Sequence, residues 1–123
     1  MSGELSATVS ITDNATGVKN PGVTSLSINR TNARRIAGVI TLSTSAIAIP
    51  LGDMTTTANC IGVFKNLHET ATIEILRATG ATKIMKLRPG ECWPIRFGSE
   101  VTAPYAVADV AAAAALDYVI YED

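Results

Sequence analysis

The chain has 123 residues, a usual size for one domain, and 47% of them are apolar, enough to build a hydrophobic core. Only 5% are aromatic, so that core must be mainly aliphatic. Ten basic residues stand against eleven acidic ones, a net charge of -1. This balance argues against a nucleic acid held through its phosphates and against a polybasic membrane-surface protein. Membrane-helix and signal-peptide patterns are missing from the sequence, so synthesis in the cytoplasm is expected.

Short stretches of alternating apolar and polar residues follow one another along the chain and predict β-strands. Strands are expected at residues 4–12, 23–30, 36–42, 46–51, within 61–76 on either side of a turn, 83–87, 92–97, 104–108 and 116–121. Turn residues (Gly, Pro, Asn and Asp) separate them every ~8–12 positions, as in sandwiches and jelly rolls. The predicted fold class is all-β: an antiparallel β-sandwich or jelly roll of about 8–10 short strands.

A single domain is expected over residues 1–123, with the N-terminal segment 1–22 available as an extended arm. Residues 109–115, DVAAAAA, combine a possible N-cap, Asp109, with the strongest helix former. Because an isolated helix of this length is unstable, at most one short helical turn is predicted there.

Residues 61–76, IGVFKNLHETATIEIL, show the strongest local pattern. Two apolar runs flank the polar turn Leu67–Thr70, and this pattern predicts a β-hairpin around which the other strands pack. Residues 92–97 are expected to point Trp93, Ile95 and Phe97 inward.

Residues that could carry chemistry are sparse. His68, the only histidine, falls in the predicted turn, where an exposed structural residue is expected rather than a catalytic one. Cys60 and Cys92 are expected to be buried or half-buried free thiols, with a disulfide as the less favoured alternative in a reducing compartment. No nucleophile elbow, phosphate-binding loop or zinc spacing is present in the sequence, so neither an enzyme, a cofactor nor a metal is expected.

Two features point toward assembly with another chain. Residues 36–42, residues 60–64 and the C-terminal strand are apolar on both faces, which predicts a partner over part of the outer surface; tolerated surface alanines are the alternative. The polar segments 13–22 and 55–59, which could wrap around a partner, are the second feature. The segment RTNARR carries Arg30, Arg34 and Arg35, for which a solvated loop is favoured over an anion or RNA site. Contacts to a partner protein are the third interpretation of these arginines, and the one that fits assembly.

Three segments carry a family resemblance: IPLGDMTTTANCIGVFKNLHETATIEIL, KLRPGECWPIRF and PYAVADVAAAAALDYVIYED. They resemble the small jelly-roll or β-sandwich virion proteins of tailed bacteriophages, of the type that decorates or cements capsids. The matched positions are turns and core residues and cover roughly the C-terminal two-thirds of the chain.

This resemblance implies a structural protein on the capsid surface that stabilises the shell by bridging capsid subunits. Its partners would be the major capsid protein or other virion proteins, and it would be a homo-oligomer, a dimer or a trimer. A tail, collar or baseplate component of the same virion is the alternative. A carbohydrate-binding jelly-roll module is a further one, with Trp93, Tyr105, Tyr118 and Tyr121 as the candidate aromatic residues.

Overall fold

The computed structural model describes residues 4–8, 12–13, 18–19, 25–29, 34–80, 82–111 and 113–122. The chain divides into two compact units, Met1–Ala33 and Arg34–Asp123. The single domain with an arm at residues 1–22 stays a prediction.

The N-terminal unit consists of two short antiparallel ladders. Strand β1 (Glu4–Thr8) pairs with β4 (Ser25–Asn29), and β2 (Thr12–Asp13) pairs with β3 (Val18–Lys19). In sequence order, β2 and β3 lie between β1 and β4. The unit therefore has the strand pairing of one long hairpin.

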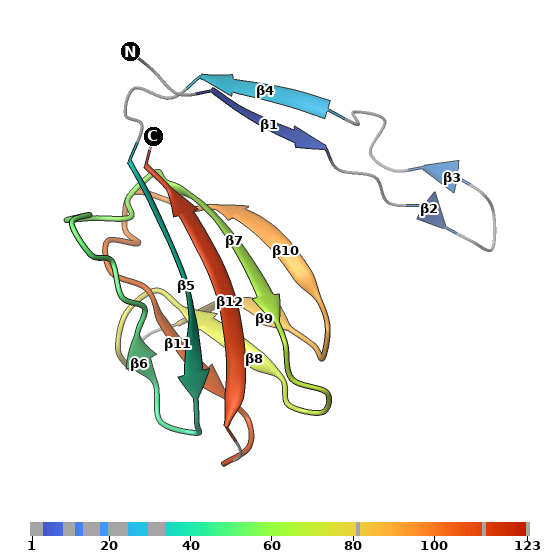
Figure 1. The fold of residues 1–123 in the computed structure, drawn as a ribbon, viewed down its shortest axis with the longest axis vertical. Coiled ribbons are helices and arrows are strands. Elements are labelled where there is room, and N and C mark those ends of the chain that lie inside the picture. Colours follow the sequence, from blue (N-terminus) through green and yellow to red (C-terminus); the bar gives the residue numbers. More distant parts are fainter. Residues whose placement is uncertain are drawn as a thin grey trace. The chain divides into compact units, whose positions relative to one another are not determined.

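The second unit, residues 34–123, has two four-stranded antiparallel sheets, which confirms the all-β fold class (Figure 1). In sheet I the strands lie in the order β10 (Cys92–Arg96), β7 (Ile61–Asn66), β12 (Ala114–Tyr121) and β5 (Arg35–Leu42). In sheet II the order is β6 (Ile47–Ala48), β11 (Tyr105–Ala108), β8 (Ile73–Leu76) and β9 (Lys83–Leu87).

The strand pairs of the sandwich are nested. Strand β8 pairs with β9, β7 with β10, β6 with β11 and β5 with β12. Successive pairs, counted outward from β8–β9, belong alternately to sheet II and sheet I. The first and last strands of the unit consequently lie side by side in sheet I.

The core lies between the sheets and is filled mainly by buried residues of β7, β8, β11 and β12. The buried apolar side chains are mostly aliphatic, as composition predicts, with Phe64 and Phe97 in edge-to-face contact at a centroid distance of 6.0 Å. Gly62 leaves room for these rings, since a Cβ there would come within 2.8 Å of Phe64 Cε2. The core cluster comprises Leu42, Ile49, Met54, Cys60, Phe64, Ala71, Ile73, Ile75, Leu87, Phe97, Val101, Ala106, Ala108, Ala114, Leu116, Tyr118 and Ile120.

The predicted hairpin at residues 61–76 is wrong. Strand β7 belongs to sheet I and β8 to sheet II, so residues 67–72 cross from one sheet to the other. Each strand buries alternate residues against the same core, but from opposite sides. Alternation shows which face of a strand is buried and carries no information about its hydrogen-bonded neighbour, which explains the error.

Two smaller differences concern β10 and the alanine-rich segment. Trp93 was expected inward but is 41% exposed, because β10 is an edge strand of sheet I. No helix occurs among the described residues of 109–115; Ala114 and Ala115 instead begin β12 and pair with Leu42 and Thr41 of β5. Here long-range pairing overrides the helix propensity of alanine.

Candidate protein interface on the outer face of sheet I

The outer face of sheet I consists of the residues that alternate with its buried positions. In β12, Leu116, Tyr118 and Ile120 are buried, so Asp117 and Val119 face outward. The strand register places the outward residues in three rows, each running from β10 through β7 and β12 to β5. The charged row is Cys92, Lys65, Asp117 and Val39; the apolar row is Pro94, Val63, Val119 and Ala37; the arginine row is Arg96, Ile61, Tyr121 and Arg35.

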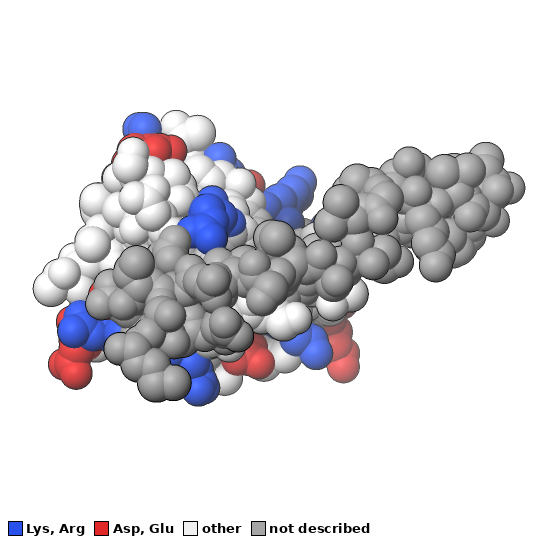
Figure 2. Space-filling view, turned by 90° about the horizontal axis from the view of Figure 1, so that it is seen from above, with Lys and Arg blue, Asp and Glu red and all other residues white. Residues whose placement is uncertain are grey.

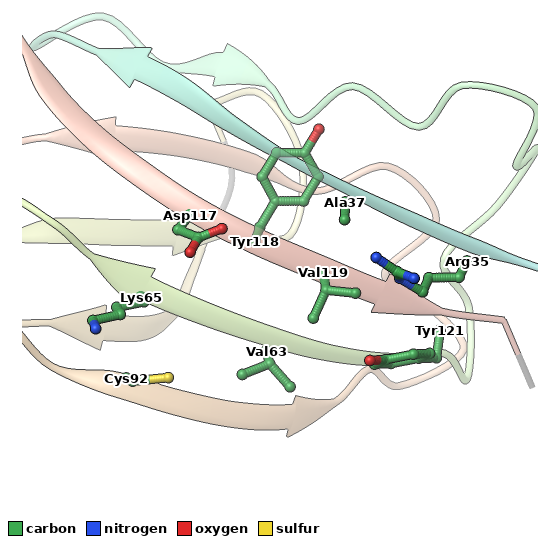
Figure 3. A pocket seen from close by; sticks show the side chains of 9 residues that line it. All are labelled: Arg35, Ala37, Val63, Lys65, Cys92, Asp117, Tyr118, Val119 and Tyr121. Carbon is green, nitrogen blue, oxygen red and sulfur yellow. The ribbon is translucent and has the colours of Figure 1, made fainter. Parts of the chain in front are cut away.

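The apolar row crosses the middle of this face. Val63 and Val119 lie next to each other at its centre, with Lys65 and Asp117 on one side and Tyr121 on the other (Figure 3). Their side chains are half-buried, and Val39 in the neighbouring row is 59% exposed. The strands expected to have two apolar faces, β5, β7 and β12, are direct neighbours, and Ala37, Val119 and Val63 on their outer faces form one continuous row.

Charge is confined to the two outer rows. Lys65 and Asp117 are cross-strand neighbours on β7 and β12, whereas Arg35 and Arg96 lie on the two edge strands. Arg96 Nη1 donates a hydrogen bond to the Asn59 carbonyl at 2.8 Å, which holds it at the rim. The rows enclose a shallow depression of about 310 Å³.

Tyr118 is a buried residue on the inner side of β12, opposite to this outer face. In Figure 3 its ring points to the opposite side of β12 from Val119, and its hydroxyl donates a hydrogen bond to the Pro50 carbonyl at 3.2 Å. Burial raises the pKa of this phenol above its ordinary value of 10.0. The ring passes close to Gly38, where a Cβ would lie 3.1 Å from the tyrosine oxygen.

The outer face of sheet II is more typical of a solvated surface. Glu74, near its middle, forms a 2.9 Å ion pair with Lys83 and faces Lys86 across the β8–β9 ladder. Basic and acidic side chains are interspersed over the described surface in the view of Figure 2. The uncharged central row therefore distinguishes sheet I from its partner sheet.

The three arginines proposed as partner contacts have different surroundings. Arg30 lies outside the described residues. Arg34 is half-exposed; its guanidinium lies 3.4 Å from the Glu122 carboxylate and donates to the Asp53 carbonyl at 3.2 Å. Arg35 is exposed at the start of β5. Arg34 and Arg35 together line a second depression, of about 250 Å³.

His68 and Asn66 organise the crossing between the sheets. The ring Nδ1 of His68 accepts backbone N–H bonds from Thr70 and Ala71 at 3.1 and 2.9 Å, so this histidine shapes its own turn. Asn66 is fully buried, and its Nδ2 donates to the carbonyls of Ala71 and Leu87 at 2.7 and 3.1 Å. The sequence predicts a turn at His68 but gives no signal for the buried role of Asn66.

Comparison with known proteins adds no family. A scan against models of protein families gives no match, and a search of curated proteins gives none either.

In the described part of the chain, the thiol and acidic side chains are not gathered at one site. Cys60 is buried, as expected, whereas Cys92 is exposed on the edge strand β10, and no disulfide joins the two. Among the described residues, no three His, Cys, Asp or Glu side chains gather closely enough to hold a metal ion. Nor does this part of the protein contain a helix long and apolar enough to cross a bilayer.

Proposed function

We propose that this protein is a structural component of a tailed-bacteriophage virion that decorates or cements the capsid shell. The observation that carries the proposal is the apolar row across the middle of the outer face of sheet I, which runs over neighbouring strands. A sandwich that works alone gains nothing from a continuous apolar row of this kind, whereas a subunit of an assembly buries it. The segments that resemble virion proteins include β7, β8, β11 and β12.

The nested strand pairing supports the same proposal. Four pairs that alternate between two sheets form the arrangement expected of a jelly roll, which occurs in viral capsid domains and in lectins. We therefore place the sandwich in the jelly-roll class as part of this proposal. Since one fold serves many functions, the outer face of sheet I and the resemblance support the proposal more than the topology does.

The physical mechanism is added buried surface across subunit junctions. A ligand that binds only the intact shell stabilises it by an amount that grows with its concentration relative to its dissociation constant. Arg34 and Arg35, at the start of the sandwich, remain the candidate contacts to the capsid protein.

The test is to incubate undecorated capsids with the purified protein and to measure cosedimentation and the temperature at which the shells open. Binding and a higher opening temperature are expected. Arg34→Ala should weaken binding, while Arg77→Ala, which removes an exposed arginine from the β8–β9 turn, should not. If the protein neither sediments with capsids nor changes their thermal resistance, capsid decoration is ruled out.

Immunogold labelling of whole particles separates this proposal from a tail, collar or baseplate location by the position of the label. The exposed Trp93 favours one function of another class, a carbohydrate-binding module, because exposed aromatic side chains can stack on sugars. A glycan array without a hit would remove that candidate.

A further inference from the structure

We propose that the outer face of sheet I packs against the same face of a second copy, around a twofold axis that runs parallel to the strands between β7 and β12. This inference rests on the proposed function, because it names what covers the surface that carries that proposal. Three properties of the face lead to it: its charge pattern, its apolar centre and its size.

The charged row is self-complementary about this axis. Lys65 and Asp117 occupy the same row on the two central strands, one on each side of the axis. The twofold rotation exchanges the two strands and brings Lys65 of each copy opposite Asp117 of the other. One row thus supplies two equivalent ion pairs, as an isologous interface requires.

The apolar row also matches itself. The same rotation stacks Val63 on the partner's Val119 and Pro94 on the partner's Ala37. In the arginine row, Ile61 meets the partner's Tyr121, while Arg35 and Arg96 approach each other only at the rim, where solvent screens their repulsion.

A twofold axis along the rows would serve less well. It would place Lys65 opposite the partner's Ile61 and Asp117 opposite the partner's Tyr121. Each charge would then lose water against an apolar side chain or a tyrosine of the partner and would gain no ion pair between the copies, which is costly. The charge pattern therefore selects the axis parallel to the strands.

The size of the face sets the expected strength. Four strands about 4.8 Å apart, with five to eight residues each rising about 3.3 Å, give an area of about 19 by 22 Å. Two copies would bury roughly 850 Å² in total, in the range of weak, transient interfaces. We expect a dimer whose population depends on protein concentration.

Charge reversal tests the pairing. Lys65→Asp and Asp117→Lys each place like charges opposite each other, and each alone should weaken dimerisation about tenfold in sedimentation equilibrium. Mixing the two variants should restore dimers as heterodimers, because each copy then faces opposite charges. A role of these residues within one chain cannot produce recovery on mixing.

Lys86→Asp, on the outer face of sheet II, is the matched control and should leave the dimer unchanged. Thermal unfolding of each variant verifies that it is folded. A wild-type protein that is monomeric at the highest concentration reached, or a mixture that stays as weak as its components, overturns the proposal.

Crosslinking tests the axis. The rotation brings Cys92 opposite the partner's Val39, so Val39→Cys should give disulfide-linked dimers with Cys92 under mild oxidation. Within one chain these positions are three strand spacings apart, about 14 Å, too far for a disulfide. Crosslinking through Arg96→Cys instead would overturn the axis. All these measurements use the protein without capsids, so failure to dimerise and failure to decorate are separate results.

Discussion

Asn66 offers the sharpest test of how the sandwich is held together. Its fully buried side chain links the turn after β7 to the end of β9, through bonds to the carbonyls of Ala71 and Leu87. Its Oδ1 also accepts the backbone N–H of His68 at 2.9 Å. Asn66→Asp keeps the size and this acceptor but replaces the donating amide group by an oxygen, so the two donated bonds are lost.

The expected loss of stability in Asn66→Asp follows from the groups that are left without a partner. Two buried carbonyls would lose their donor, at about 1–3 kcal/mol each, and no cavity is created because the side chains are nearly isosteric. The new carboxyl group also loses its hydration at this buried position. We therefore expect the free energy of unfolding to fall by at least about 3 kcal/mol, and the midpoint temperature of a unit this size by at least about 10 °C.

The assay is thermal and urea unfolding followed by circular dichroism at neutral pH. Asn59→Asp is the control: it makes the same chemical change at an exposed position, where the positive φ of 64° suits aspartate as well as asparagine. It should alter stability by less than about 0.5 kcal/mol. An Asn66→Asp protein as stable as this control would show that the two bonds contribute little.

Two further residues, His68 and Tyr118, give predictions that stability measurements can test. His68→Ala removes the acceptor of two backbone N–H groups and should lower the free energy of unfolding, measured in urea, by about 1–2 kcal/mol. His68→Asn, which keeps an acceptor near the same place, should recover part of this loss. Equal losses in the two variants would contradict the role of His68 in forming the turn. The raised pKa of Tyr118 means that the unfolded chain releases this proton near pH 10 while the folded protein retains it. Below that pH the group adds no pH dependence, and above it stability should fall as pH rises. Tyr118→Phe should flatten the alkaline fall and cost about 1 kcal/mol at neutral pH through the lost bond to Pro50; an unchanged alkaline slope would contradict the assignment.

The strands were predictable because their residues alternate so regularly. Residues 36–42, 83–87 and 104–108 coincide closely with β5, β9 and β11. Their partners were not predictable, since hydrogen-bonded neighbours such as β5 and β12 lie far apart in sequence. The role of Asn66 was missed for a related reason. Its acceptors are the carbonyls of Ala71 and Leu87, and Leu87, 21 residues away in sequence, comes near only when the end of β9 lies beside β7.

The candidate interface was partly predictable, because several strands are apolar on both faces in the sequence. Composition alone left open whether Ala37 and its neighbours were tolerated at a surface or covered by a partner. The register decides where they lie: Ala37, Val119 and Val63 form one row across three adjacent strands. The pairing of Lys65 with Asp117 in the next row had no signal in the sequence, because the two residues are distant along the chain.

The nested pairing also sets the order in which the chain can fold. The β8–β9 ladder closes the shortest loop, and each further pair encloses the ones before it, so the loop-closure entropy for β5–β12 is smallest once the inner pairs exist. The outward rows of sheet I are complete only when this last pair has formed. Association between copies through that face would then follow folding and would not compete with it.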